Sequence, residues 1–350
     1  MTITEEHNLT EQCDWLNEEN RTDPRVTERL NAAGCLFLSI LPYGQAVPAV
    51  ICIFVLLTLF SLLVNGFTLF RLGRSDDLSW EPRVTFFTNL IMSDLVQTVT
   101  FAPSVIHALV QRRTMEFSLW CRVQYFVGAS SIFSSLYSIT CMAMERYFYV
   151  CHAIHYPVIL TRVRLRLALT AIWVSSISVG TVATVLLHTG EEQKNEPFIS
   201  GLLCEPDVVE QHMGFPRAPA VFRKVFGFAT LLLCLLVYVF CYFRMYQDAS
   251  NAMIPFDAVN TAARKTMLFY CGMLLLQLLP LLIKVAPDVL WEYEGVHTAT
   301  TATVFHISLA VMVLVPPCIN PLVYGLRNAE MRRALLGPFR RWMERRRTDV

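Results

Sequence analysis

Two neighbouring residues of opposite charge, Glu145 and Arg146, lie where a long apolar segment of the chain ends. No charged residue lies between Arg122 and Glu145, a stretch long enough to cross a lipid bilayer as a helix. With Tyr147, the pair can form ion pairs and hydrogen bonds at a membrane face, where long charged side chains reach the headgroups. This pattern is typical either of an ordinary charge pair that closes a membrane helix or of a switch at the inner end of a helix bundle.

A second group of polar residues lies inside apolar segments, where ionisable groups are costly and often functional. Asp94 is in the middle of one segment, Asn65 in the middle of another, and Asn320 near the end of the last. Ser135 precedes Arg146 by a few helical turns and can face them. These residues predict a polar chamber suited to water and a monovalent cation, so sodium near Asp94 is the one ion that we expect. Hydrogen bonding between helices is the alternative interpretation.

Prolines inside two apolar segments indicate hinges. Asn320 and Pro321 are followed by Tyr324, which places a phenol one turn beyond a helix-distorting residue. Because proline has no backbone N–H, it leaves one carbonyl of its helix without the usual partner and permits a bend. Pro280, which follows Gln277 in another segment, offers a second hinge.

Several other classes of protein are disfavoured by the residues that the sequence lacks. We find no cluster of metal ligands and no nucleophile with a matching base, so neither a metal site nor an enzyme is expected. No basic stripe with interleaved aromatic residues occurs, so a nucleic-acid partner is not expected. A channel or transporter is the alternative from a different class. It would need charges that converge on a path through the membrane, whereas the ionisable residues here are Asp94 and groups near segment ends.

The elements that carry these residues are predicted to be membrane helices. The 350 residues are 54% hydrophobic and 16% charged, compared with about 25% charged in a typical soluble domain. The apolar segments do not alternate apolar and polar residues as barrel strands must, so helices are the way to satisfy their backbone in lipid. We therefore predict an all-α bundle of seven transmembrane helices, over residues 46–70, 84–110, 121–149, 167–187, 222–246, 266–287 and 299–325.

The charges in the loops predict how the bundle is oriented. Basic loops at one face alternate with acidic loops at the other, so the positive-inside rule places the N-terminus outside the cell and the C-terminus in the cytoplasm. In a multi-pass protein of the plasma membrane, residues 1–45 are then an extracellular tail, 46–325 the bundle and 326–350 a cytoplasmic segment. This last segment begins with a short amphipathic helix, 327–336, that can lie on membrane lipid.

Residues outside the bundle indicate modification and binding. Asn8 and Asn20 begin N-glycosylation sequons in the extracellular tail. Cys121 and Cys204 both face the oxidising side, which favours a disulfide between them. The terminal Val350 belongs to a sequence that fits a ligand of PDZ domains.

Taken in order, these motifs resemble those of the rhodopsin-like (class A) G-protein-coupled receptors, across residues 46–336. The acidic residue, arginine and tyrosine that end the third helix of that family match Glu145, Arg146 and Tyr147. The other matches are Asn65, Asp94, Trp173, Asn320, Pro321 and Tyr324, together with the bridging cysteines Cys121 and Cys204. Each motif is short, but their order within seven spans makes the joint match specific.

Within that family, two stretches resemble odorant receptors. They are residues 142–159 and 317–328, and the sequence at 81–83 is similar to the fish-type group. The resemblance implies a chemosensory receptor, with a non-olfactory orphan receptor for a peptide or a lipid as the runner-up. Leu278 departs from the family, because many relatives have a tryptophan at that position.

The resemblance also implies where a ligand and a G protein bind. The ligand would occupy the outer half of the bundle, between helices three, five, six and seven. The expected contacts are Gly128, Ala129, Ile132, Phe133, Gln277, Lys284 and His306. None of the third-helix positions is acidic, which argues against an amine ligand and favours a small, mostly apolar one.

On activation, the inner end of the sixth helix would swing out, so that Arg146 and Tyr324 meet a heterotrimeric G protein. The start of the sixth helix offers no obvious glutamate to pair with Arg146. Glu145 is therefore the expected neighbour of that arginine.

Overall fold

The computed structural model of the chain describes residues 47–74, 81–114, 118–191, 217–251 and 314–323, with the single residues 34, 37, 41, 272, 325 and 332. These ranges are mainly helical, and no strand occurs within them. The prediction of an all-α protein is therefore confirmed.

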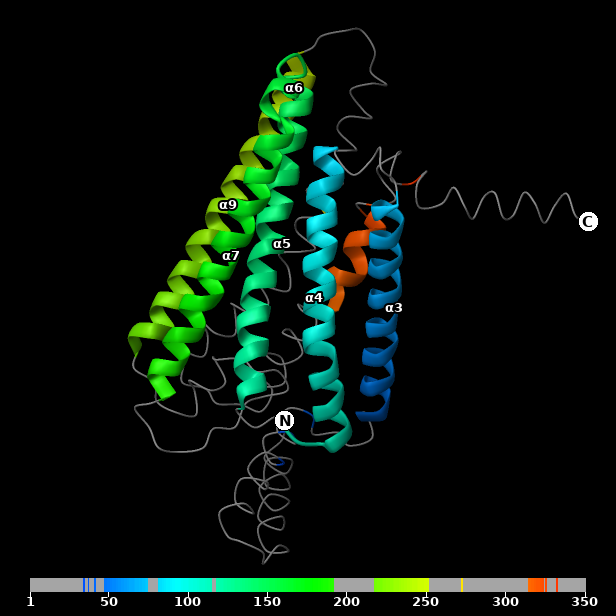
Figure 1. Cartoon of the computed structure of the whole chain (residues 1–350), viewed down its shortest axis with the longest axis vertical. Helices are drawn as coiled ribbons and strands as arrows, with labels where there is room; N and C mark the ends of the chain where they lie inside the picture. Colours follow the sequence, from blue (N-terminus) through cyan, green and yellow to red (C-terminus); the bar gives the residue numbers. More distant parts are fainter. Residues whose placement is uncertain are drawn as a thin grey trace, which may run out of the picture.

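The long helices of the described part run side by side, alternately up and down (Figure 1). They are α3 (Val47–Gly73), α4 (Pro82–Gln111), α5 (Leu119–Cys151), α7 (Arg162–Glu191) and α9 (Arg217–Asn251). Two shorter helices accompany them. The first, α6 (Tyr156–Ile159), follows α5, and the second, Leu314–Val323, is drawn in orange near α3 and α4.

The composition of these helices suits a membrane. α3, α5, Arg162–Leu186 of α7 and Val225–Asp248 of α9 are long and apolar enough to span one. Exposure is inverted relative to a soluble protein: Leu63 of α3 is 71% exposed, whereas Asn65 and Asp94 are 0% and 1% exposed. Apolar side chains on the outside can contact lipid, while polar groups find partners between the helices.

α5 lies at the centre of the described bundle and packs against α4, α7 and α9, while α3 packs against α4. Buried apolar side chains form two clusters at opposite ends of these helices. One surrounds Phe87, Met142 and Tyr238, near the end of α5. The other includes Phe101 and Leu314, near the end of α4. The polar residues of the predicted chamber lie between these two apolar layers.

The observed helices begin and end within a few residues of the predicted segments, but most of them are longer. α4 covers Pro82–Gln111 where 84–110 was predicted, and α7 begins at Arg162 where the prediction began at 167. The arginines at 162, 164 and 166, which were expected in a loop, therefore lie in the first turns of α7. A helix continues past its apolar part because each further residue adds a backbone hydrogen bond. α6 was not predicted, since a single turn leaves no periodic pattern.

Some predictions concern residues outside the described part. The tails 1–45 and 326–350 and the sixth segment, 266–287, lie almost wholly outside it, and Tyr324 lies outside it as well. Of the seventh predicted segment, the structure describes the helix Leu314–Val323. The boundaries of the three predicted regions of the chain therefore stay predictions.

Candidate functional site

Asp94 is the centre of a buried polar cluster that joins α4, α5 and the helix Leu314–Val323. The side-chain nitrogen Nδ2 of Asn320 donates a hydrogen bond to Oδ2 of Asp94 at 2.8 Å. The hydroxyl of Ser135 donates to Oδ1 of the same carboxylate at 3.4 Å. The structure therefore brings together three of the four residues that were predicted to form a polar chamber.

Asn65, the fourth residue, contacts the helix Leu314–Val323 and reaches Asp94 indirectly. Its Nδ2 donates to the backbone carbonyl oxygen of Pro317 at 2.8 Å. The hydroxyl of Ser61, which accepts a hydrogen bond from Asn65, is also hydrogen-bonded to Thr98 at 3.0 Å. Thr98 in turn donates to the backbone carbonyl of Asp94. A continuous polar path thus connects α3 with the carboxylate-bearing turn of α4.

The cluster fits a monovalent cation in part. Hard cations such as sodium are bound by oxygen atoms, and the carboxylate of Asp94 and the hydroxyl of Ser135 supply oxygens at one place. Asn320 presents its amide nitrogen to Asp94, so it stabilises the carboxylate as a donor and is not itself a cation ligand in this arrangement. A cation at this cluster would be held by Asp94 and Ser135.

A second polar network lies between α4, α5 and α7. The indole nitrogen of Trp173 donates to Oδ1 of Asn89 at 2.8 Å, and Nδ2 of Asn89 donates to the hydroxyl of Ser138 at 2.8 Å. Ser93 donates to the hydroxyl of Ser134 at 2.9 Å. Of these residues, only Trp173 belongs to a motif recognised in the sequence. In the sequence, Asn89 and Ser93 are four residues apart, as are Ser134 and Ser138. This spacing places each pair on one face of its helix and was the signal available.

Glu145 is buried near the end of α5, with an exposed fraction of 1%. Arg83, from the first turn of α4, donates to both of its carboxylate oxygens, at 3.3 and 3.4 Å. The phenol of Tyr156, the first residue of α6, donates to Oε1 at 2.9 Å. From the sequence, Arg146 is the expected neighbour of Glu145, and neither Arg83 nor Tyr156 is predicted to donate to it.

The two residues that follow Glu145 have different surroundings. Arg146 is half-buried. The phenol oxygen of Tyr147 lies 3.1 Å from Nε2 of His152, and its ring packs against Phe240 of α9 with 5.9 Å between the ring centroids. The end of α5 is therefore tied to α9 through Tyr147 and to α4 and α6 through Glu145.

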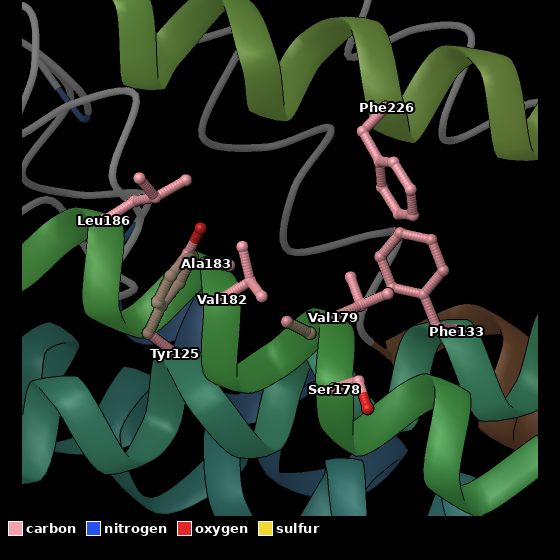
Figure 2. A pocket seen from close by; sticks show the side chains of 9 residues that line it. Tyr125, Phe133, Ser178, Val179, Val182, Ala183, Leu186 and Phe226 are labelled. Atoms are coloured by element: carbon pink, nitrogen blue, oxygen red, sulfur yellow. The ribbon is translucent and has the colours of Figure 1, made fainter.

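A cavity of about 280 Å³ lies between α5, α7 and α9. Its walls are almost entirely apolar, with the hydroxyls of Tyr125 and Ser178 as the polar exceptions (Figure 2). Phe133 of α5 and Phe226 of α9 meet at one side, with their ring centroids 6.2 Å apart. The remaining lining residues are Ala129, Val179, Val182, Ala183 and Leu186.

Two of the residues predicted as ligand contacts, Ala129 and Phe133, line this cavity. Gly128 faces α4, where an added Cβ would collide with the ring of Phe101. Ile132 is half-buried and does not line this cavity. The contribution of α7 was not predicted. Gln277, Lys284 and His306 lie outside the described residues.

Cys121, at the start of α5, is disulfide-bonded. The other cysteines of the described part have free thiols, so the partner lies outside it. That this partner is Cys204 stays a prediction.

The chain is similar in sequence to known membrane receptors. Residues 64–324 match the family described as 7 transmembrane receptor (rhodopsin family). Human olfactory receptor 10A3 is 27% identical over 271 residues, which cover 74% of this chain and 80% of that protein. Human olfactory receptor 2A25 is 25% identical over 308 residues, covering 85% and 91%. Human atypical chemokine receptor 3 is 22% identical over 262 residues, covering 73% and 69%.

Proposed function

Because the chain belongs to the rhodopsin family of seven-transmembrane receptors, we propose that it is a chemosensory receptor for a small, mostly apolar ligand. The protein is a multi-pass receptor of the plasma membrane and not an enzyme, and the family implies coupling to a heterotrimeric G protein. Its similarity to human olfactory receptors supports a chemosensory role over that of a channel or transporter.

The cavity between α5, α7 and α9 is the observation that carries this proposal. Its volume of about 280 Å³ lies near the lower end of the roughly 300–1,000 Å³ usual for small-molecule sites. Its apolar walls would bind a ligand mainly by removing apolar surface from water, at about 25 cal/mol for each Å². The hydroxyls of Tyr125 and Ser178 are the polar groups that the cavity lining presents to a ligand, and the hydroxyl of Ser178 also donates to the backbone carbonyl of Val174.

The cavity and the charged end of α5 are well separated, as a receptor requires. Phe133, the lining residue of α5 nearest to Glu145, precedes it by twelve residues, or about 18 Å along the helix. With the N-terminus outside, the cavity belongs to the outer half of the bundle, and the cluster around Asp94 lies between it and the cytoplasm. Ligand binding would shift the population between two packings of the helices. Arg146, Tyr147, Asn320, Pro321 and Tyr324 would form the switch that meets the G protein.

Filling the cavity tests this function directly. We expect that Ala183→Phe, which places a ring in the cavity, abolishes responses to ligands found in an odorant panel with a cAMP readout. Ala171→Phe is the matched control, because it makes the same substitution on an exposed face of the same helix. Equal loss of surface-normalised response in both variants, or retention in both, would contradict a ligand site in this cavity.

Further contacts would come from residues outside the described part. We include Gln277, Lys284 and His306 in the ligand site, and we expect Lys284→Ala to change ligand preference without lowering surface expression. Unchanged dose-response curves across the panel would remove Lys284 from the site.

The same proposal extends to the rest of the chain. Asn8 and Asn20 would carry glycans on the extracellular tail, and a Cys121–Cys204 disulfide would hold the outer loop over the bundle. The segment 326–350 would lie along membrane lipid through its amphipathic helix, and Val350 would bind a PDZ domain. A sodium ion would be held at Asp94 and Ser135.

A receptor for a peptide is the second candidate, because one relative is an atypical chemokine receptor. Expression confined to sensory epithelium would favour the chemosensory role, whereas expression elsewhere together with a peptide response would favour this second candidate.

A further inference from the structure

The carboxylate of Glu145 is held by a residue that lies 62 positions earlier in the chain. Arg83 approaches it with two nitrogens, Nη2 to Oε1 at 3.3 Å and Nε to Oε2 at 3.4 Å. A guanidinium that uses two donors on one carboxylate fixes both the position and the orientation of its partner. Since the Glu145 side chain is 0% exposed and that of Arg83 is 24% exposed, water screens this ion pair only from one side.

The same carboxylate also holds α6 in place. The phenol of Tyr156 donates to Oε1 of Glu145 at 2.9 Å. Burial and the adjacent charge of Glu145 raise the pKa of this phenol, so it keeps its proton and remains a donor throughout the physiological pH range. Glu145 therefore connects the first turn of α4, the last turns of α5 and the first residue of α6.

Aromatic rings hold the arginine in the geometry that this contact needs. The guanidinium carbon of Arg83 lies 4.9 Å from the centroid of the Tyr149 ring, within the range of a cation–π interaction. The ring of Tyr149 meets that of Tyr156 edge to face, with centroids 5.4 Å apart. Tyr149 thus contacts both the cation and Tyr156, which reduces the conformational freedom that Arg83 loses on pairing.

We propose that Arg83 is a positioning residue of the intracellular switch, which acts by supplying the positive charge that the buried Glu145 carboxylate requires. This inference rests on the proposed function as a receptor that activates a G protein. A buried carboxylate is stable only with a cation or several donors around it. While Arg83 balances the charge of the Glu145 carboxylate, the adjacent Arg146 is not needed to balance it.

Loss of the Arg83 charge would change the partner of Glu145. Arg146 is the next residue in the chain, so the buried carboxylate would attract it. An arginine drawn towards Glu145 presents its guanidinium less well to a G protein at the cytoplasmic face. Arg83 therefore affects signalling without itself contacting the G protein.

The test uses the full-length receptor, purified and reconstituted in lipid nanodiscs with a heterotrimeric G protein. The readout is ligand-independent nucleotide exchange per folded receptor, so that no ligand has to be known. We expect Arg83→Gln to slow exchange by about fivefold or more, the usual lower range of coupling between two sites. The double variant Arg83→Gln, Glu145→Gln should recover most of the exchange, because no carboxylate remains to attract Arg146. Arg83→Lys, which keeps the charge, should fall between the parent and Arg83→Gln.

Arg74→Gln is the matched control, since Arg74 is an exposed arginine at the same face and stacks on Phe70 without contacting Glu145. Parental exchange by Arg83→Gln, or a double variant that stays as slow as Arg83→Gln, would overturn the inference. If the parent and Arg74→Gln both lack ligand-independent exchange, the comparison is repeated with an odorant that activates the parent, and a parent that no ligand of the panel activates contradicts the proposed receptor function. The pairing of Arg83 with Glu145 is also tested by melting temperature. Adding Glu145→Gln should restore the stability that Arg83→Gln loses. Additive losses in the double variant would refute the pairing.

Discussion

Asn65 of α3 donates a hydrogen bond from Nδ2 to the backbone carbonyl oxygen of Pro317, at 2.8 Å. In an uninterrupted α-helix, that carbonyl would accept from the backbone N–H four residues later, at position 321. Residue 321 is proline and has no N–H. A side chain from another helix therefore completes the backbone hydrogen bonding of the helix Leu314–Val323.

This relationship predicts that Asn65 and Pro321 are energetically coupled. Asn65→Ala should lower the free energy of unfolding by about 1–3 kcal/mol, because it leaves a buried carbonyl without a partner. In a Pro321→Ala background the loss should be smaller, since the new backbone N–H can bond to Pro317. A double-mutant cycle of unfolding free energies in one detergent measures this coupling. Strictly additive effects would mean that the freed carbonyl is not what Asn65 satisfies.

The Asp94 cluster predicts a specific effect of sodium on stability. A ligand that binds only the folded protein raises its melting temperature. Replacing choline chloride by sodium chloride at constant ionic strength should therefore raise the melting temperature of the parent. Asp94→Asn keeps a side chain that can bond to Asn320 but removes the charge, so its melting temperature should not respond. The same response in parent and variant would exclude sodium binding at Asp94.

Gly180 allows α5 and α7 to approach closely, because a Cβ at this position would collide with the hydroxyl of Ser130 and lie 3.1 Å from the carbonyl oxygen of Phe126. Gly180→Ala should destabilise the protein by about 1–3 kcal/mol through this overpacking. Gly66→Ala is the matched control in another helix, where the added Cβ has no neighbour within 4 Å.

Because alanine favours helix over glycine, the Gly66 change should instead stabilise the protein by about 0.5–1 kcal/mol. Melting temperatures of the two purified variants give the comparison. A Gly180→Ala protein as stable as the parent would show that the two helices can separate without cost.

The helices could be predicted because lipid imposes a length and a composition on each of them. The apolar segments 84–110 and 121–149 correspond closely to α4 and α5. The ends were less accurate, because a helix continues into the headgroup region on backbone hydrogen bonds that do not depend on apolar side chains. α6, at Tyr156–Ile159, is held by contacts with other elements and leaves no periodic pattern of its own.

The residues of the candidate site that could be predicted were those whose polar side chains cost the most free energy to bury in lipid. Asp94, Ser135 and Asn320 were grouped because polar residues inside apolar segments need partners, and the structure places them together. The contact between Arg83 and Glu145 could not be predicted in this way. This contact depends on which helices are neighbours and on how each is rotated about its axis. A single sequence does not give either piece of information. The spacing of Asn89 and Ser93 places both on one face of α4, but the sequence does not show that this face meets α5 and α7.

Arg146→Ala in reconstituted receptor with a heterotrimeric G protein tests whether the charged end of α5 activates the G protein. We expect this variant to fold and to reach the cell surface normally but to stimulate nucleotide exchange no faster than receptor-free vesicles do. Arg113→Ala, an exposed arginine beyond the opposite end of the bundle, should exchange like the parent. Exchange by Arg146→Ala at the parental rate would show that this arginine does not take part in G-protein activation.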